Sequence, residues 1–151
     1  MIPARFDYHA PATLEEAIQL LARHGDSAKV LAGGHSLIPA MKFRLALPDI
    51  LIDLNRLDGL RYIREEKNDL AIGAMTPEAW IDESPIVRHG FALLADTAHV
   101  IADPLVRNRG TIGGNLAHAD PANDHPATML AYGATLVAQS ASGRRTIAID
   151  D

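Results

Sequence analysis

The spacing of hydrophobic residues in the first third of the chain predicts a small α/β unit. Apolar residues recur at helical intervals after Thr13, which forms a capping box with Glu16, and Gly25 is a suitable residue to end that helix. Two short apolar runs predict strands. The expected elements are a helix at 13–24, a strand at 28–32, one or two helical turns at 37–44 and a strand at 50–54. Residues 1–56 are interpreted as one unit.

The pattern changes after residue 56, where apolar runs are separated by turn residues. A short helix is expected to open with Thr76 as its cap and Pro77 at its first position, and Ser84-Pro85 repeats this signal. Residues 102–125 carry glycine and proline without periodicity and are interpreted as loop. The other expected elements are a hairpin of 60–65 and 70–75 closed by Glu66-Lys67-Asn68-Asp69, helices at 91–101 and 126–132, the second ended by Gly133, and a hairpin of 134–139 and 146–149.

Composition then limits the class of protein. The 151 residues are 48% hydrophobic and 22% charged, which is enough for a folded core. There is no cysteine, so this chain holds no disulfide, thiolate zinc site or iron–sulfur cluster, and a reducing compartment is favoured. The net charge of −5 argues against a nucleic-acid binder. No apolar run is long enough to span a membrane, and no signal peptide is recognised at the N-terminus.

Two glycine-containing segments carry the chemistry that is easiest to interpret. Glycines let backbone N–H groups approach a phosphate closely, and small hydroxyl or amide side chains add further hydrogen bonds. Neither segment has the spacing of a P-loop or of a dinucleotide-binding G-x-G-x-x-G motif. Two such segments can clamp one extended dinucleotide from two sides. They comprise Ala32, Gly33, Gly34, His35, Ser36 and Leu37 in the first, and Thr111, Gly113, Gly114 and Asn115 in the second.

A third segment, 118–125, contains two histidines and two aspartates and invites a metal interpretation. Its spacing matches no metal-ligand signature, and its Asp-Pro and Pro-Ala-Asn-Asp steps are typical of turns, so no metal is assigned. The pair Arg107 and Arg109 could contact a phosphate or a protein partner, but solvated loop arginines explain it equally well. No nucleophile elbow is present.

The motifs Ala32–Pro39 and Arg107–Asn115 make the chain recognisable. They resemble the FAD-binding medium subunit of molybdenum hydroxylases, the family of the carbon monoxide dehydrogenase medium chain and the xanthine dehydrogenase FAD subunit. The likeness continues through Ile101–Pro104 and His118–Pro126, and it covers essentially the whole chain.

The resemblance implies an α+β fold, namely the two-subdomain, PCMH-type FAD-binding domain shared with vanillyl-alcohol oxidase. Residues 1–56 would form the N-terminal α/β subdomain with the first glycine motif. Residues 57–151 would form a second α+β subdomain, incomplete at its C-terminus, and the family's C-terminal domain would be absent. FAD would lie between the subdomains. The implied FAD contacts are Ala32, Gly33, Gly34, His35, Ser36, Leu37, Ile101, Ala102, Thr111, Gly113, Gly114, Asn115, His118, Asp120, Pro121 and Asp124.

The resemblance also implies a function. The chain would be an electron-transfer subunit that receives electrons from a small [2Fe–2S] subunit, after a large molybdenum-cofactor subunit oxidises the substrate, and would pass them through FAD to an external acceptor. No acid, base or nucleophile is assigned to it. The expected location is the cytoplasm or, through partners, the inner face of the membrane. The alternatives are a free-standing FAD oxidoreductase, a hydrolase using a metal bound by His118, Asp120, Asp124 and His125, and a nucleotide-binding module without redox turnover.

Overall fold

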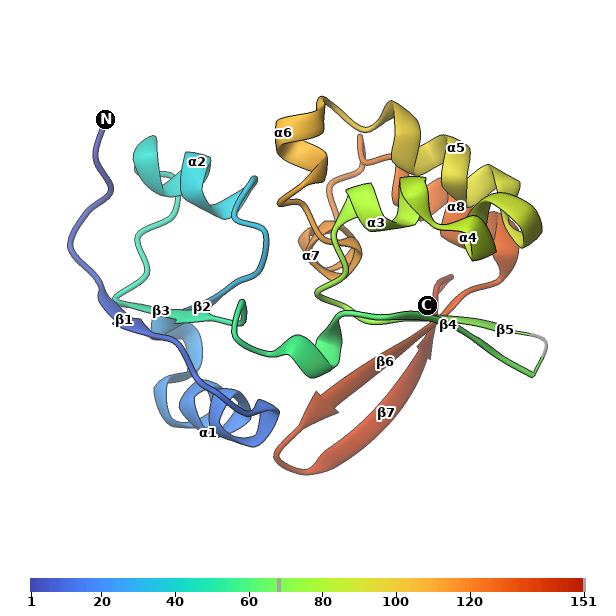
Figure 1. Ribbon diagram of the computed structural model, residues 1–151. Coiled ribbons are helices and arrows are strands. Elements are labelled where there is room, and N and C mark those ends of the chain that lie inside the picture. The colour runs from blue at the N-terminus through green and yellow to red at the C-terminus, as the bar shows by residue number, and fades with distance from the viewer. Residues whose placement is uncertain (68, 151) are drawn as a thin grey trace.

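The computed structural model describes residues 1–67 and 69–150. Asn68 of the predicted hairpin turn and Asp151 of the predicted second subdomain lie outside the described residues. Figure 1 shows the N-terminal sheet with its two helices in the left half of the view and a larger, mainly helical part in the right half. The elements are β1 (Asp7–His9), α1 (Leu14–His24), η1 (Gly25–Ser27), β2 (Ala28–Leu31), α2 (Leu37–Lys42), β3 (Ile50–Asp53), η2 (Asp58–Leu60), β4 (Ile63–Glu66), β5 (Asp69–Ile72), α3 (Glu78–Glu83), α4 (Pro85–Gly90), α5 (Ala92–Val100), α6 (Pro104–Arg107), α7 (Ile112–His118), α8 (His125–Tyr132), β6 (Thr135–Ser140) and β7 (Gly143–Ala148).

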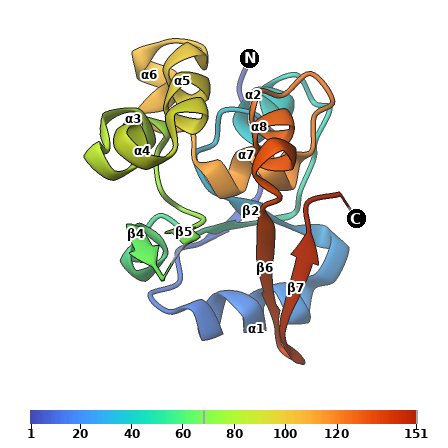
Figure 2. The same ribbon diagram turned by 90° about the vertical axis from the view of Figure 1, so that its right-hand side faces the viewer.

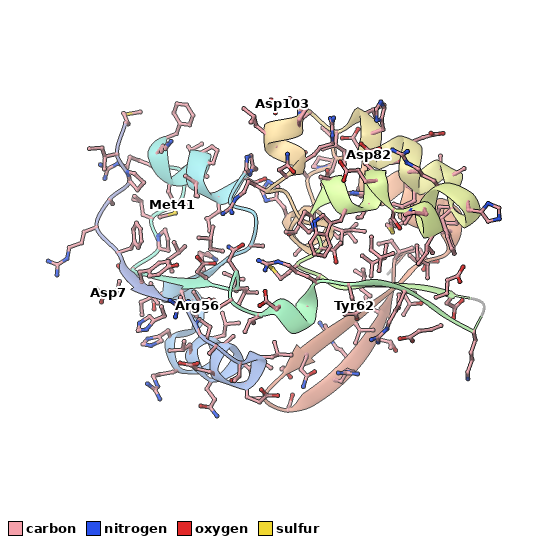
Figure 3. All side chains as sticks on the ribbon, viewed as in Figure 1. Asp7, Met41, Arg56, Tyr62, Asp82 and Asp103 are labelled. Atoms are coloured by element: carbon pink, nitrogen blue, oxygen red, sulfur yellow. The ribbon has the colours of Figure 1, made fainter. Side chains whose placement is uncertain are left out.

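The N-terminal part is a parallel three-stranded sheet with a helix on each face. The strand order is β1-β3-β2, and both outer strands run parallel to β3. Successive residues of β3 point to opposite faces, so Ile52 packs in the core beneath α1 while Leu51 packs with Met41 of α2. Figure 3 shows Met41 directed from α2 toward the sheet. The predicted α/β unit is therefore present, with each sheet face covered.

Strand β1 was not expected from the sequence. Its residues Asp7, Tyr8 and His9 include no aliphatic side chain, so the hydrophobic pattern gives no strand signal. It pairs along β3 from Asp7 opposite Ile50 to His9 opposite Ile52. Backbone pairing with a strand already buried on both faces therefore compensates for its low apolar content.

The second part has its own hydrophobic core. Seven buried side chains from α3, α4, α5, α7 and α8 form a single cluster with partly buried ones from the β4–β5 hairpin and from Ala134 and Ile149, which flank the β6–β7 hairpin. Figure 2 shows these helices gathered above the two hairpins, with the β6–β7 hairpin projecting away from them. Leu57 and Leu60 pack instead with the N-terminal core. The subdomain boundary at residues 56 and 57 stays a prediction, and the first core includes side chains just beyond it.

The start of α3 corrects one prediction. Pro77 is itself the extended N-cap residue, and the helix begins at Glu78. The Thr76 side chain does not cap it. The Thr76 hydroxyl accepts the Tyr62 backbone N–H at 3.1 Å and donates to the Tyr62 carbonyl at 3.0 Å. Thr76 therefore connects the chain after β5 to the residue just before β4, and this tertiary use of a threonine hydroxyl overrides the local capping signal.

The segment 102–125 also differs from prediction, because it contains two helices. Asp103 caps α6 by accepting the N–H groups of Leu105 and Val106, and Thr111 caps α7 by accepting the N–H of Gly114. The two adjacent glycines of α7 have poor helix propensity, so the sequence gives no helix signal there. The second glycine segment is consequently a helix start rather than a loop.

Candidate functional site

The first glycine segment, residues 32–37, directly follows β2 and leads into α2. Gly34 has φ of +81°, a conformation that glycine adopts without steric cost. The structure gives the backbone N–H groups of all five residues from Gly33 to Leu37 no protein acceptor within residues 1–67 and 69–150. His35 and Ser36 are exposed. The segment is therefore a run of open donors at the carboxyl end of a parallel strand, a place where α/β sheets commonly bind anionic ligands.

The second glycine segment, residues 111–115, does not present its amides in this way. The Ile112 N–H donates to the Thr76 carbonyl at 3.2 Å, and the Gly113 N–H donates to the Ala74 carbonyl at 2.9 Å. The Gly114 N–H donates to the Thr111 hydroxyl at 3.2 Å. The expectation that both segments offer backbone donors to an anion is thus wrong for these three residues, because tertiary contacts and the helix cap already use their N–H groups.

The two segments nevertheless lie against each other. A Cβ at Gly33 would overlap the Arg109 carbonyl oxygen and would come 2.9 Å from the Gly110 Cα. A Cβ at Gly114 would come 3.4 Å from the Ala32 Cβ. The absence of a side chain at Gly33 therefore lets the backbones of the N-terminal and second parts touch, whereas the tight contact at Gly114 would be with the Thr111 hydroxyl oxygen, 2.8 Å away. Gly113 serves a different contact, because a Cβ there would come 2.6 Å from the Ala74 Cβ.

Two polar side chains of the second segment still have hydrogen-bonding capacity. The Thr111 hydroxyl oxygen accepts the Gly114 N–H, which leaves its proton available to donate. The Asn115 Oδ1 is buried and has no partner among the described residues. Because a buried polar atom is normally satisfied, Asn115 indicates that a further polar group belongs here.

A cavity of about 530 Å³ opens at the junction of the two parts and includes Thr111 of the second segment. It is bordered by Asn55 of the N-terminal part and by Asp58, Arg61, Pro77 and Trp80 of the second part. The remaining residues that border it are Met75, Asn108 and Arg109.

A polar cluster at the end of β3 is hydrogen-bonded to the start of the first glycine segment. The Tyr8 hydroxyl donates to Asp53 at 2.6 Å, and the Asn55 side chain donates both to Asp53 at 2.6 Å and to the Ala32 carbonyl at 2.9 Å. Burial raises the pKa of Asp53, but the hydrogen bonds from Tyr8 and Asn55, with the nearby charge of Arg109, outweigh it and hold that pKa below its usual value. Sequence analysis missed this cluster because Tyr8 and Ala32 are far in the chain from Asp53 and Asn55.

We expect Tyr8→Phe to lower the free energy of unfolding by about 0.5–1 kcal/mol at pH 7, because Asp53 loses one donor. The folded-state pKa of Asp53 is lowered, so its contribution is present above the unfolded pKa and disappears as the pH falls through the folded value. Urea unfolding at pH 7 and near pH 2.5 measures this. Tyr62→Phe is the control, and an equal loss at both pH values would contradict the assignment.

The third segment, 118–125, is divided between surface and core. His118 and Asp120 are exposed, and Asp120 accepts the Ala122 N–H in a turn at 2.9 Å. The Asn123 side chain donates to the Asn115 carbonyl at 2.9 Å, which ties this segment to the second glycine segment. Within the described residues, no three histidine, aspartate or glutamate side chains gather in a way that could hold a metal ion. The geometry therefore gives the metal interpretation no support. The segment's other predicted contacts are Pro121 and Asp124, both exposed.

His125 points into the core and pairs with Glu78, a residue that sequence analysis did not single out. The His125 Nε2 lies 2.7 Å from the Glu78 Oε2, and both side chains are at most 2% exposed. The Glu78 backbone N–H also donates to the Gly110 carbonyl at 2.9 Å. The pair therefore joins the starts of α3 and α8 directly behind the chain that enters the second glycine segment. Glu78 lies three residues before the buried Ile81 on α3, and this helical spacing was the only sequence signal that Glu78 faces the core.

The basic pair Arg107 and Arg109 separates into two roles. Arg107 is mostly buried, and its guanidinium donates to the Ile101 carbonyl at 2.9 Å and lies 3.9 Å from Asp82. Arg109 is exposed and borders the cavity. Ile101 and Ala102, two further sequence-predicted contacts, form the turn that Arg107 holds.

Comparison with known proteins gives a consistent result. Residues 4–151 match the model of a family described as "FAD binding domain in molybdopterin dehydrogenase". The chain is 55% identical over 150 residues to a carbon monoxide dehydrogenase medium chain of Hydrogenophaga pseudoflava, covering 99% of this chain and 52% of that protein. It is 44% identical over 151 residues to the 6-hydroxypseudooxynicotine dehydrogenase complex subunit alpha of Paenarthrobacter nicotinovorans, covering 100% and 51%.

Solved structures agree. The carbon monoxide dehydrogenase structure from Hydrogenophaga pseudoflava, which lacks the Mo-pyranopterin moiety of its cofactor, superimposes with a TM-score of 0.97 at 56% identity, over 99% of this chain and 52% of that one. Quinoline 2-oxidoreductase from Pseudomonas putida 86 gives 0.96 at 38% identity, over 100% and 53%. The chain thus spans about half the length of the relatives it matches.

Proposed function

The chain belongs to the family of FAD-binding domains in molybdopterin dehydrogenases, and from that membership we propose that it binds FAD between its two glycine segments. The bound FAD would serve electron transfer in a molybdenum-containing hydroxylase of the carbon monoxide dehydrogenase type. FAD supplies the redox chemistry, whereas the residues of this chain bind and orient it. No side chain is proposed as acid, base or nucleophile.

The observation that carries this proposal is the run of open N–H groups from Gly33 to Leu37. Successive backbone donors of this kind form a concave site for an anion such as a diphosphate. They explain how a chain with a net charge of −5 can hold a dinucleotide without a basic patch. The first segment is therefore assigned to the diphosphate through its backbone, with the exposed Ser36 hydroxyl as a further donor.

The second segment is assigned a different task. Its glycines allow close packing, and the free proton of Thr111 together with the unpaired Asn115 Oδ1 supplies the polar contacts toward FAD. The exposed residues of the third segment and the turn after α5 complete the proposed site. These additional contacts are Ile101, Ala102, His118, Asp120, Pro121 and Asp124.

The proposed partners are a large subunit with the molybdenum cofactor and a small subunit with [2Fe–2S] clusters. The chain contains no cysteine to hold such clusters itself, and its relatives include proteins named as medium chains or complex subunits. Electrons would pass from the clusters through FAD to an external acceptor. Within the described residues, no helix has both the length and the apolar character required to cross a membrane.

Titration of the purified chain with FAD tests the proposal. We expect saturable binding and, in backbone amide NMR spectra, large proton shifts for Gly33–Leu37. The N–H groups of Ile112 and Gly113 already have protein acceptors at 3.2 and 2.9 Å, so smaller shifts are expected there. Inorganic pyrophosphate should shift the same first-segment amides, because it shares the diphosphate.

Riboflavin, which lacks the diphosphate, is the matched control ligand and should leave the first-segment amides unchanged. Absence of FAD binding would contradict the proposed function. Binding that shifts only amides far from both glycine segments would retain FAD as ligand and reject the site. Copurification with an iron–sulfur subunit and a molybdenum subunit tests the proposed partners separately.

A further inference from the structure

The turn between α5 and α6 adopts a strained conformation beside the proposed site. Ala102 has φ of +42°, in the left-handed region that costs a non-glycine residue roughly 1–2 kcal/mol. Its backbone N–H has no protein acceptor in the part of the chain that the structure describes. Strained residues persist only where their surroundings hold them in place, so the structure must contain a restraint on this turn.

Arg107 provides that restraint. Its Nη1 donates to the Ile101 carbonyl at 2.9 Å, across the turn from the end of α6. Its Nε lies 3.9 Å from the Asp82 Oδ2, and both side chains are 15% exposed. In Figure 3, Asp82 is labelled on α3, and Asp103 marks the start of α6. The carboxylate and the carbonyl thus hold one guanidinium from two directions.

Peptide geometry links this contact to the open N–H. The Ile101 carbonyl and the Ala102 N–H belong to one peptide unit, and in a planar trans peptide they point in opposite directions. A guanidinium that draws the carbonyl inward therefore turns the Ala102 N–H outward. Ala102 is an exposed residue, which agrees with an outward-facing N–H.

We propose that Arg107, held by Asp82, is a positioning residue that aims the Ala102 N–H at bound FAD. This inference rests on the proposed function, because it requires FAD to lie against the turn. Arg107 itself touches no cofactor in this arrangement. It acts only through the orientation of the Ile101–Ala102 peptide.

The test compares Arg107→Met with Arg88→Met. Arg88 contacts the same residue, because its Nε donates to the Asp82 carbonyl at 2.6 Å and its Nη2 lies 3.6 Å from the Asp82 Oδ1, but among the described residues it has no bond to the turn. We expect Arg107→Met to weaken FAD binding about tenfold, the equivalent of one lost hydrogen bond, and to shift the absorption band of bound flavin. Arg88→Met should change neither. Arg107→Lys, which can still donate to the carbonyl, should restore most of the affinity.

A second readout needs no cofactor. In the FAD-free chain, Arg107→Met should move the Ala102 amide resonance, while Arg88→Met leaves it in place, and thermal unfolding of both variants reports the common loss of stability. An unmoved Ala102 amide, or equal effects of the two variants on FAD binding, would overturn the inference. If the wild-type chain bound no FAD while Arg107→Met still moved that amide, the proposed function would fail and Arg107 would retain only its control of the turn.

Discussion

Replacement of Gly33 by valine should abolish measurable FAD binding and lower the melting temperature. A Cβ at this position would come within 2.9 Å of both the Arg109 carbonyl carbon and the Gly110 Cα, and closer still to the Arg109 carbonyl oxygen. Backbone atoms cannot move aside as a side chain can, so the two glycine segments must separate. We expect an affinity loss of at least about 100-fold, which is roughly 3 kcal/mol of binding free energy, and a destabilisation of about 3 kcal/mol.

Gly59→Val is the matched control for this substitution. A Cβ at Gly59 would meet no atom within 4 Å, and its φ is not in the left-handed region, so both affinity and stability should stay close to wild type. FAD titration and thermal unfolding of the two variants distinguish a general effect of valine from contact between the segments. A Gly33→Val variant that binds FAD with wild-type affinity would show that the segments do not act together.

Much of the fold was predictable because local signals agree with tertiary packing there. Thr13 caps α1 as predicted and accepts the Glu16 N–H at 3.2 Å, and Ser84 caps α4 with Pro85 in its first turn. The signals failed where tertiary contacts decide the outcome. Strand β1 lacks aliphatic residues, and the Thr76 hydroxyl bonds to the Tyr62 backbone instead of capping the following helix.

The candidate site, like the fold, could be predicted from the sequence only in part. The family and the cofactor predicted from the glycine motifs are confirmed by the family match, while the individual FAD contacts stay predictions. Sequence placed both motifs in one site but could not show that they differ, with open donors in the first and occupied ones at Ile112 and Gly113 in the second. That difference depends on Thr76 and Ala74, which are distant in sequence from both motifs.

Substitution of Glu78 by alanine should destabilise the second part of the chain more than any surface change. It would leave the His125 imidazole, which is fully buried, without its only hydrogen-bond partner among the described residues. Removing one member of a buried pair costs about 3–5 kcal/mol, because the other member stays desolvated and unpaired. The backbone N–H of residue 78, which donates to the Gly110 carbonyl, is retained in this variant, so the loss reports on the side-chain pair.

Two comparisons make this prediction specific. Glu66→Ala removes an exposed carboxylate that is 2.6 Å from Arg64, and such surface pairs contribute about 0–1 kcal/mol. The double substitution Glu78→Met with His125→Leu replaces the pair by apolar groups and should recover most of the lost stability, because neither partner is then left unsatisfied. Urea unfolding of the three variants provides the free energies. The same measurement with FAD present would show whether the second glycine segment depends on the Glu78–His125 pair. A double variant no more stable than Glu78→Ala would mean that the pair stabilises the fold through its polarity.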